Sequence, residues 1–534
     1  MFLSLFPYFL GFLFASGSTF LLSYLSIATS FGPWVTPILL ILGHLILSYI
    51  PFLAIDKKNL ILAKAQSMGA VGGIIATGVG FSLPMLYFLD EATFNAWLAA
   101  PWLFCLAMFA TCIAAGGLGI ALGWLWAPKL CNENSDLLFP VSTFTWRLLS
   151  ISSLKPLKTS FMHGSWISLS LCFLRDHILL YAKNCSTIAC IAWQKTASLG
   201  IGIWPSLWAL GYIVGPTLAQ PLLIGLIFKN GILPYLPYLV SLSGFELSQT
   251  LTIQQITFAF CSGLILGDLL CHIRLPLKKI HVMLSKLNHS KSYLKTIRQA
   301  GLIPLLISCC ALCGILTIAH FSFLAQLCLL GATIAATYFI CLFASRSGML
   351  PLGRFSVFVL LPLFFMFSLS PLQSTIVCII FNICAATASD LLFDYKTFQL
   401  CQIPQTSTRK LQIFGLLVTA ITLGACLWIL FSLLPLGTEA FCAQRGKTKA
   451  ILLQTFSLDY HFILPGIIAS FIFRYFRINI TMIFGGIVMH NGLAIGLTIG
   501  SIISRFIKTS DHKTIFCAGV FCAETLWIFV KLLF

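Results

Sequence analysis

The stretch 411–436, LQIFGLLVTAITLGACLWILFSLLPL, contains no charged residue and is typical of a helix that crosses a membrane. An α-helix needs about 20 consecutive apolar residues to cross the hydrocarbon core of a bilayer. Comparable runs recur along the 534 residues, of which 59% are hydrophobic and 9% are charged. An average soluble domain carries roughly 25% charged residues because its surface faces water. The sequence therefore predicts an all-α polytopic membrane protein and excludes a soluble enzyme, a disulfide scaffold and a disordered chain.

Apolar runs predict a series of membrane spans along the whole chain. The expected spans are residues 3–28, 32–54, 66–89, 99–126, 161–181, 204–228, 254–273, 301–320, 322–344, 355–370, 371–389, 411–436, 456–474, 479–503 and 514–533. The first run is too long for the apolar core of a signal peptide, so we expect it to remain as a span. Two shorter pieces, 137–152 and 232–245, are typical of half-helices, re-entrant segments or weakly marked spans. We expect about 14–17 transmembrane helices in two bundled halves, some of them broken or re-entrant.

Positive charge is concentrated in one polar segment, 274–298, which contains Lys and Arg but no acidic residue. The chain carries 32 Lys and Arg against 14 Asp and Glu, a net charge of +18. Because cytoplasmic loops are enriched in Lys and Arg, this surplus indicates topology and not a nucleic-acid partner. Contact with anionic lipids is the functional alternative for the segment. We expect an N-terminal transmembrane half at 1–273, a basic cytoplasmic loop at 274–300 and a C-terminal transmembrane half at 301–534.

A few acidic residues lie where lipid should exclude them. Glu524 falls in the middle of its expected span, Asp268 lies near the end of another, and Asp390 and Asp394 close a third. Ionisable groups inside spans are costly unless they are paired or hydrated, which makes them candidates for functional sites. These four residues are the candidates for proton coupling, with Glu524 first and Asp268 second. The alternative for each is an interfacial or internally paired structural charge.

The two aspartates also belong to a short charged run. Asp390 and Asp394 are one helical turn apart and share a face, and Lys396 is expected to be close enough to neutralise one of them. With Thr397 they form a candidate charge cluster that organises a gate or an ion route.

Glycine and proline gather inside several expected spans. Examples are 69–73, 485–486 and the run of Gly211, Tyr212, Gly215 and Pro216. Broken helices that line a polar cavity are one interpretation. Close packing of helices through small residues is the other, and both can hold at once.

Motifs for other chemistries are absent from the sequence. The one Cys-x-x-Cys, at Cys310 and Cys313, lies within an expected span, which argues against a zinc or redox site. The sequence contains no Walker A motif, and no His-Glu-x-x-His or Gly-x-Ser-x-Gly element. We expect no cofactor, no metal site and no enzymatic activity.

Several motifs occur in the order found in the oligopeptide transporter superfamily, which includes the yellow stripe-like metal-chelate carriers. The most informative is 389–397, SDLLFDYKT, which resembles the Asp-x-x-x-Asp-x-Lys-Thr-Gly run of that family. The sequence departs from the pattern at Phe398, where the family usually has glycine, and at Arg346, where bacterial members often have an acid. The other similar pieces are Gln66-Ser67 with Gly72, Gly73, Gly78, Phe81 and Pro84; Phe139-Pro140; Gly211 to Pro216; Ser347 to Gly353 with Gly348 and Pro351; and Gly519 to Glu524.

This resemblance implies a bacterial-type secondary importer that works by alternating access in the cytoplasmic membrane. It implies proton-coupled symport of short peptides or metal-chelate complexes, with Gly211, Tyr212, Gly215, Pro216, Gly348 and Pro351 as candidates for lining the cavity. The expected partners are the small-molecule substrate, protons and the lipid bilayer, with a second copy of the chain as a further candidate. The competing classes are an uncoupled channel and a polytopic membrane enzyme such as a lipid-linked transferase. For such an enzyme, 127–160 is the only loop long enough to hold the catalytic residues.

Overall fold

The computed structural model describes residues 2–235, 256–267 and 302–527, with shorter gaps inside these ranges. The regular secondary structure of the described part is helical except for one antiparallel hairpin, formed by β1 (Thr187–Gln194) and β2 (Ala197–Gly202). Within it, six helical stretches are long and apolar enough to cross a membrane, and six shorter apolar helices accompany them. The protein is thus an all-α polytopic membrane protein, as the sequence predicts. The total of about 14–17 spans stays a prediction, because several expected spans fall partly in the gaps.

The chain forms two compact units, each built from two separate segments. The first unit combines Met1–Ser153 with Ile280–Ala450, and the second combines Leu154–Lys279 with Ile451–Phe534. Each unit therefore takes one segment from before the basic loop and one from after it. The units do not coincide with the sequence halves 1–273 and 301–534, because helices that are distant in sequence pair with each other. The loop at 274–300 lies outside the described residues.

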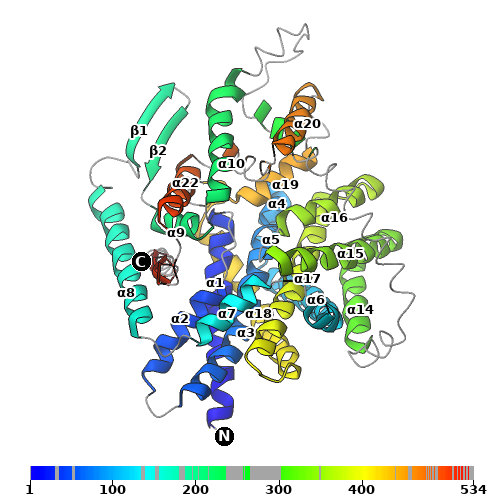
Figure 1. Cartoon of the computed structure of the whole chain (residues 1–534). Coiled ribbons are helices and arrows are strands. Elements are labelled where there is room, and N and C mark those ends of the chain that lie inside the picture. Colours follow the sequence, from blue (N-terminus) through cyan, green and yellow to red (C-terminus); the bar gives the residue numbers. More distant parts are fainter. Residues whose placement is uncertain are drawn as a thin grey trace. The chain divides into compact units, whose positions relative to one another are not determined.

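The first unit is organised around two long helices, α3 and α17. Of the apolar window in α17, 94% is buried inside the protein, and the value is 83% for the stretch that includes α3, against 44% for α1. α3 contacts α1, α2, α17 and α18, and α17 also contacts α6, α15 and α16 (Figure 1). The helices of this unit are α1 (Phe2–Thr29), α2 (Val35–Ser48), α3 (Ile55–Gly80), α4 (Pro84–Leu89), α5 (Glu91–Leu98), α6 (Pro101–Ala127), α7 (Pro140–Ser150), α14 (Leu302–Ile318), α15 (Phe323–Ser347), α16 (Leu352–Phe367), α17 (Pro371–Leu400) and α18 (Thr406–Leu433). The first part of α19 (Gln444–Gln454), up to Ala450, also belongs to it.

The glycines of α3 serve close helix packing. α3 continues without a break through 69–73 and ends only at Gly80, before the turn that leads to α4. A Cβ atom at Gly72 would stand 2.5 Å from the carbonyl oxygen of Ala15 on α1. Close packing against α1 therefore explains the glycines at 69–73. The expected break of the helix occurs later, at Gly80.

α17 is longer than the expected span 371–389, and this changes the place of the two aspartates. The helix begins at Pro371 behind a capping box between Ser370 and Gln373, and it continues to Leu400. Asp390 and Asp394 therefore lie inside the helix and not after it. The physical reason is that no glycine or proline interrupts the segment after Pro371, since Phe398 stands where the family that the motif resembles usually has glycine.

The second unit contains shorter helices around α22. α22 (Asn491–Phe506) contacts α9 (Pro205–Val214), α10 (Pro216–Ile227) and strand β2 (Figure 1). The other main helices of the second unit are α8 (Lys155–Phe173) and α20 (Tyr460–Tyr475). A π-helical turn at Leu174–Leu179 extends α8. A side chain at Gly211 would collide with the carbonyl oxygen of Leu497, so small residues again allow close packing.

Candidate functional site

Asp390 and Asp394 form a buried pair of carboxylates on α17. Their side chains point to the same face, as the spacing predicts, and the two residues are 6% and 2% exposed. Gln412 of α18 connects them, because its Nε2 donates to Asp390 Oδ2 at 2.9 Å and to Asp394 Oδ2 at 2.6 Å. One amide group therefore supplies both carboxylates.

Further donors reach Asp394 from α3. Ser67 Oγ donates to Asp394 Oδ2 at 2.5 Å, and Gln66 Nε2 lies 3.4 Å from Asp394 Oδ1. Gln66 Nε2 also lies 3.3 Å from Oγ1 of Thr36 on α2. Four helices thus converge on a site that we call the carboxylate cluster, which consists of Thr36, Gln66, Ser67, Asp390, Asp394 and Gln412.

All the donors that the structure describes in the carboxylate cluster are neutral groups. Among the residues that the structure describes, no Lys or Arg lies within ion-pair distance of either aspartate. Two negative charges one helical turn apart repel each other, and this repulsion is strong in a buried site of low dielectric constant. The arrangement therefore suits a site that holds a proton or another cation between the two carboxylates.

Lys396 does not neutralise either aspartate, contrary to the expectation from the sequence. Its Nζ donates to the carbonyl oxygen of Cys131 and to Gln399 Oε1, both at 3.0 Å. The reason is helical geometry, since Lys396 is two residues after Asp394 and therefore projects from the opposite face. Thr397 Oγ1 donates to the Phe393 carbonyl oxygen of its own helix at 2.8 Å, so it does not join the carboxylates either.

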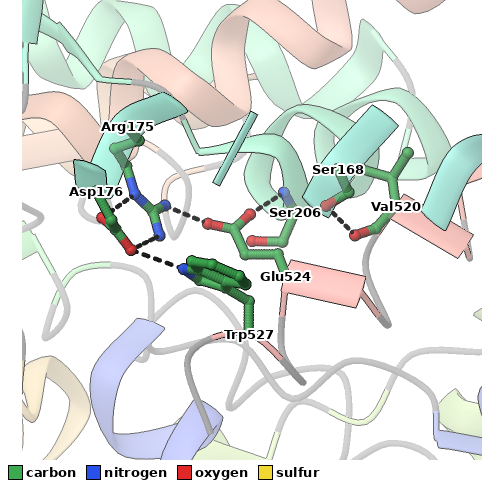
Figure 2. Close-up of polar contacts among 7 residues, drawn as sticks. All are labelled: Ser168, Arg175, Asp176, Ser206, Val520, Glu524 and Trp527. Carbon is green, nitrogen blue, oxygen red and sulfur yellow. Dashed lines mark hydrogen bonds and ion pairs between the residues drawn. The ribbon is translucent and has the colours of Figure 1, made fainter. Parts of the chain in front are cut away.

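Glu524 lies in a different cluster, in the second unit. Its Oε1 accepts a bond from Arg175 Nη1 at 2.6 Å, and its Oε2 accepts one from the Ser206 backbone N–H at 2.5 Å (Figure 2). The Glu524 side chain is completely buried. Glu524 is therefore internally paired, which is the alternative that the sequence left open for each acid.

Arg175 is held from several sides. Its Nε and Nη2 contact Asp176 at 2.9 and 3.3 Å, and its guanidinium lies 4.8 Å from the ring centre of Trp204. Asp176 in turn accepts a bond from Trp527 Nε1 at 2.8 Å (Figure 2). We call these residues, with Ser206 and Glu524, the arginine cluster. A fixed arginine stabilises the ionised form of Glu524, so this geometry favours a structural role over proton exchange.

The remaining candidates are only partly described. Gly211 packs against α22, and the Tyr212 hydroxyl donates to the Ile507 carbonyl oxygen at 3.4 Å. Pro216 is the first residue of α10, directly after the end of α9 at Val214. Asp268, Gly215, Gly348 and Pro351 lie outside the described residues.

Sequence reasoning missed Gln412, Arg175 and Asp176 as members of these clusters. Gln412 was visible as the one amide in the charge-free stretch 411–436. Arg175 and Asp176 were visible as an adjacent pair of opposite charges inside the expected span 161–181. Gln66 and Ser67 entered only through the family resemblance, without a role.

Neither a search for metal-binding groups nor comparisons with known proteins assign a further role to these residues. In the part of the chain that the structure describes, no group of three or more His, Cys, Asp or Glu residues is placed to hold a metal ion. No protein-family model matches the chain, and a search of curated proteins finds no match. The resemblance to oligopeptide transporters therefore rests on the motifs alone.

Proposed function

We propose that this protein is a secondary active transporter that couples the movement of a small solute to protons through Asp390 and Asp394. The observation that carries the proposal is the buried pair of carboxylates, to which only neutral groups donate among the described residues. Buried acids inside membrane helices are commonly parts of proton or ion routes.

The chemistry of the pair supports proton exchange. If Asp390 and Asp394 share one proton, the mutual repulsion of two charges is removed and Gln412 still donates to both. A shift of α17 relative to α3 or α18 would change the hydrogen bonds that stabilise the ionised form. Proton binding at the pair would thus depend on how these helices are packed, which is the coupling that alternating access requires.

The motif resemblance supports the choice of substrate. It favours short peptides or metal-chelate complexes, import by alternating access, and the cytoplasmic membrane of a bacterium. The competing functions are a polytopic membrane enzyme and an uncoupled channel.

Uptake into proteoliposomes tests the proposal. Purified protein is reconstituted, and a panel of di- and tripeptides and of ferric and nickel chelates is offered with and without an inward-directed proton gradient. The proposal predicts that at least one solute accumulates above its equilibrium level, and that a protonophore abolishes the accumulation. Passive equilibration would indicate a channel, and no uptake of any solute would contradict a transporter for these substrates.

A further inference from the structure

Lys449 is a buried lysine that the proposed function does not use. It lies on α19, a short helix that also carries Arg445 and Lys447, and it is 2% exposed. Among the described residues, its Nζ has one hydrogen-bond partner, Ser82 Oγ at 3.1 Å. No described Asp or Glu lies within ion-pair distance of it. A buried ammonium group is costly unless a counter-charge and further hydrogen bonds compensate it.

Ser82 and Asn382 complete the surroundings of Lys449. Ser82 lies in the turn between α3 and α4, and its Oγ donates to the Gly78 carbonyl oxygen at 3.2 Å. Asn382 of α17 donates from Nδ2 to Ser82 Oγ at 2.6 Å and to the Gly78 carbonyl oxygen at 3.1 Å. The hydroxyl of Ser82 thus donates once and accepts twice, so its hydrogen-bonding capacity is filled.

Lys449 and Asn382 each have hydrogen-bonding groups without a partner among the described residues. The Lys449 ammonium has three N–H donors, and one of them bonds to a described residue. Oδ1 of Asn382, whose side chain is completely buried, accepts no bond from any described residue. The guanidinium of Arg445 lies 4.4 Å over the ring of Phe81 and adds a second positive charge near the same turn. A ligand that matches these groups would therefore place an anion at Lys449 and an N–H donor at Asn382 Oδ1.

We propose that Lys449 and Asn382 form a binding site for a small carboxylate with an amide N–H on the carbon next to the carboxylate, such as an N-acylated amino acid. The carboxylate accepts hydrogen bonds from the free N–H groups of Lys449, and the amide N–H donates to Asn382 Oδ1. Charge-assisted bonds of this kind are stronger than neutral ones. The proposal rests on the proposed function only in making this ligand a candidate for the transported solute.

Binding to the full-length protein in detergent tests the site without any gradient. Equilibrium dialysis compares N-acetylglycine with N-acetylglycinamide, which lacks the charge, and with N-acetylsarcosine, which lacks the N–H. We expect N-acetylglycine to bind, and both analogues to bind about 10-fold more weakly or worse. Failure of the wild-type protein to bind N-acetylglycine would overturn the proposal, as would equal binding of the uncharged amide or of inorganic phosphate. Because no transport is measured, a failure of the proposed function leaves this result unaffected.

Three variants locate the binding. Lys449→Met is expected to weaken binding about 10- to 100-fold, whereas Lys447→Met, on the same helix but partly exposed, is expected to leave it unchanged. Lys449→Met removes a buried charge for which no described residue supplies a counter-charge, so the unfolding temperature of this variant should not fall. Asn382→Asp would supply Lys449 with an internal carboxylate and should abolish binding while it raises the unfolding temperature. Wild-type affinity in both the Lys449 and the Asn382 variants would place the ligand elsewhere and refute the site.

Discussion

Replacing Glu524 by glutamine separates a structural role of this residue from a role in proton coupling. Glu524 and Arg175 are both almost fully buried, with side chains 0% and 7% exposed, so water does not screen their contact. The substitution removes the charge but keeps an oxygen that accepts from Arg175 or from the Ser206 N–H. Asp176 remains as the second acidic partner of Arg175.

The expected loss of stability follows from these contacts. Breaking a buried ion pair by removing one partner costs about 3–5 kcal/mol, because the other charge is left uncompensated. Arg175 keeps its two bonds to Asp176 in the variant, so the cost should lie below that range. Since one charge-assisted bond becomes a neutral bond, we expect Glu524→Gln to lower the free energy of unfolding by about 2–3 kcal/mol.

Reversible unfolding in mixed detergent micelles, followed by circular dichroism, measures this change. Glu91→Gln is the matched control, because it is the same substitution at an exposed position in the first turn of α5 and should change stability by less than about 1 kcal/mol. In proteoliposomes, Glu524→Gln should keep gradient-driven uptake and the pH dependence of that uptake. Unchanged stability together with lost coupling would refute the structural reading and make Glu524 a proton carrier.

Three further substitutions test other parts of the structure. Ser67→Ala removes a donor from a buried carboxylate and should lower the free energy of unfolding by about 1–3 kcal/mol in the same assay; no change would mean that the bond is absent. Gly72→Val places a side chain against the α1 backbone and should abolish folded, monodisperse protein in size-exclusion chromatography, whereas Gly17→Val, which meets no neighbour within 4 Å, should be tolerated. Asp90 caps α5 through Thr93, whose hydrogen bonds lower the pKa of this carboxyl. Its contribution is therefore present above the usual range of aspartate and lost as pH falls through the lowered pKa, so the difference in thermal stability between Asp90→Ala and wild type should shrink at low pH.

Hydropathy predicted the fold class and the approximate place of many helices. The common face of Asp390 and Asp394 followed from their spacing. These features depend on residues close together in sequence, for which the helical repeat and the bilayer thickness set the rule.

Pairing between distant segments was not predictable in the same way. Arg175 and Glu524 are 349 positions apart, and Ser67 and Asp394 are 327 apart. Hydropathy marks each helix but does not say which helix lies beside it, because neighbours are selected by small residues and by buried polar contacts. The expectation for Lys396 was wrong for a local reason, since a residue two positions after Asp394 projects from the opposite face of the helix.

Counterflow measured beside gradient-driven accumulation shows whether Asp390 and Asp394 carry the coupling proton. Asp394→Asn and Asp390→Asn keep the size of the side chain but remove its ability to exchange a proton. In proteoliposomes with a solute that the wild-type protein accumulates, both variants should still exchange labelled for unlabelled solute, yet fail to accumulate it when a proton gradient is imposed. Accumulation at the wild-type level by both variants would contradict the account.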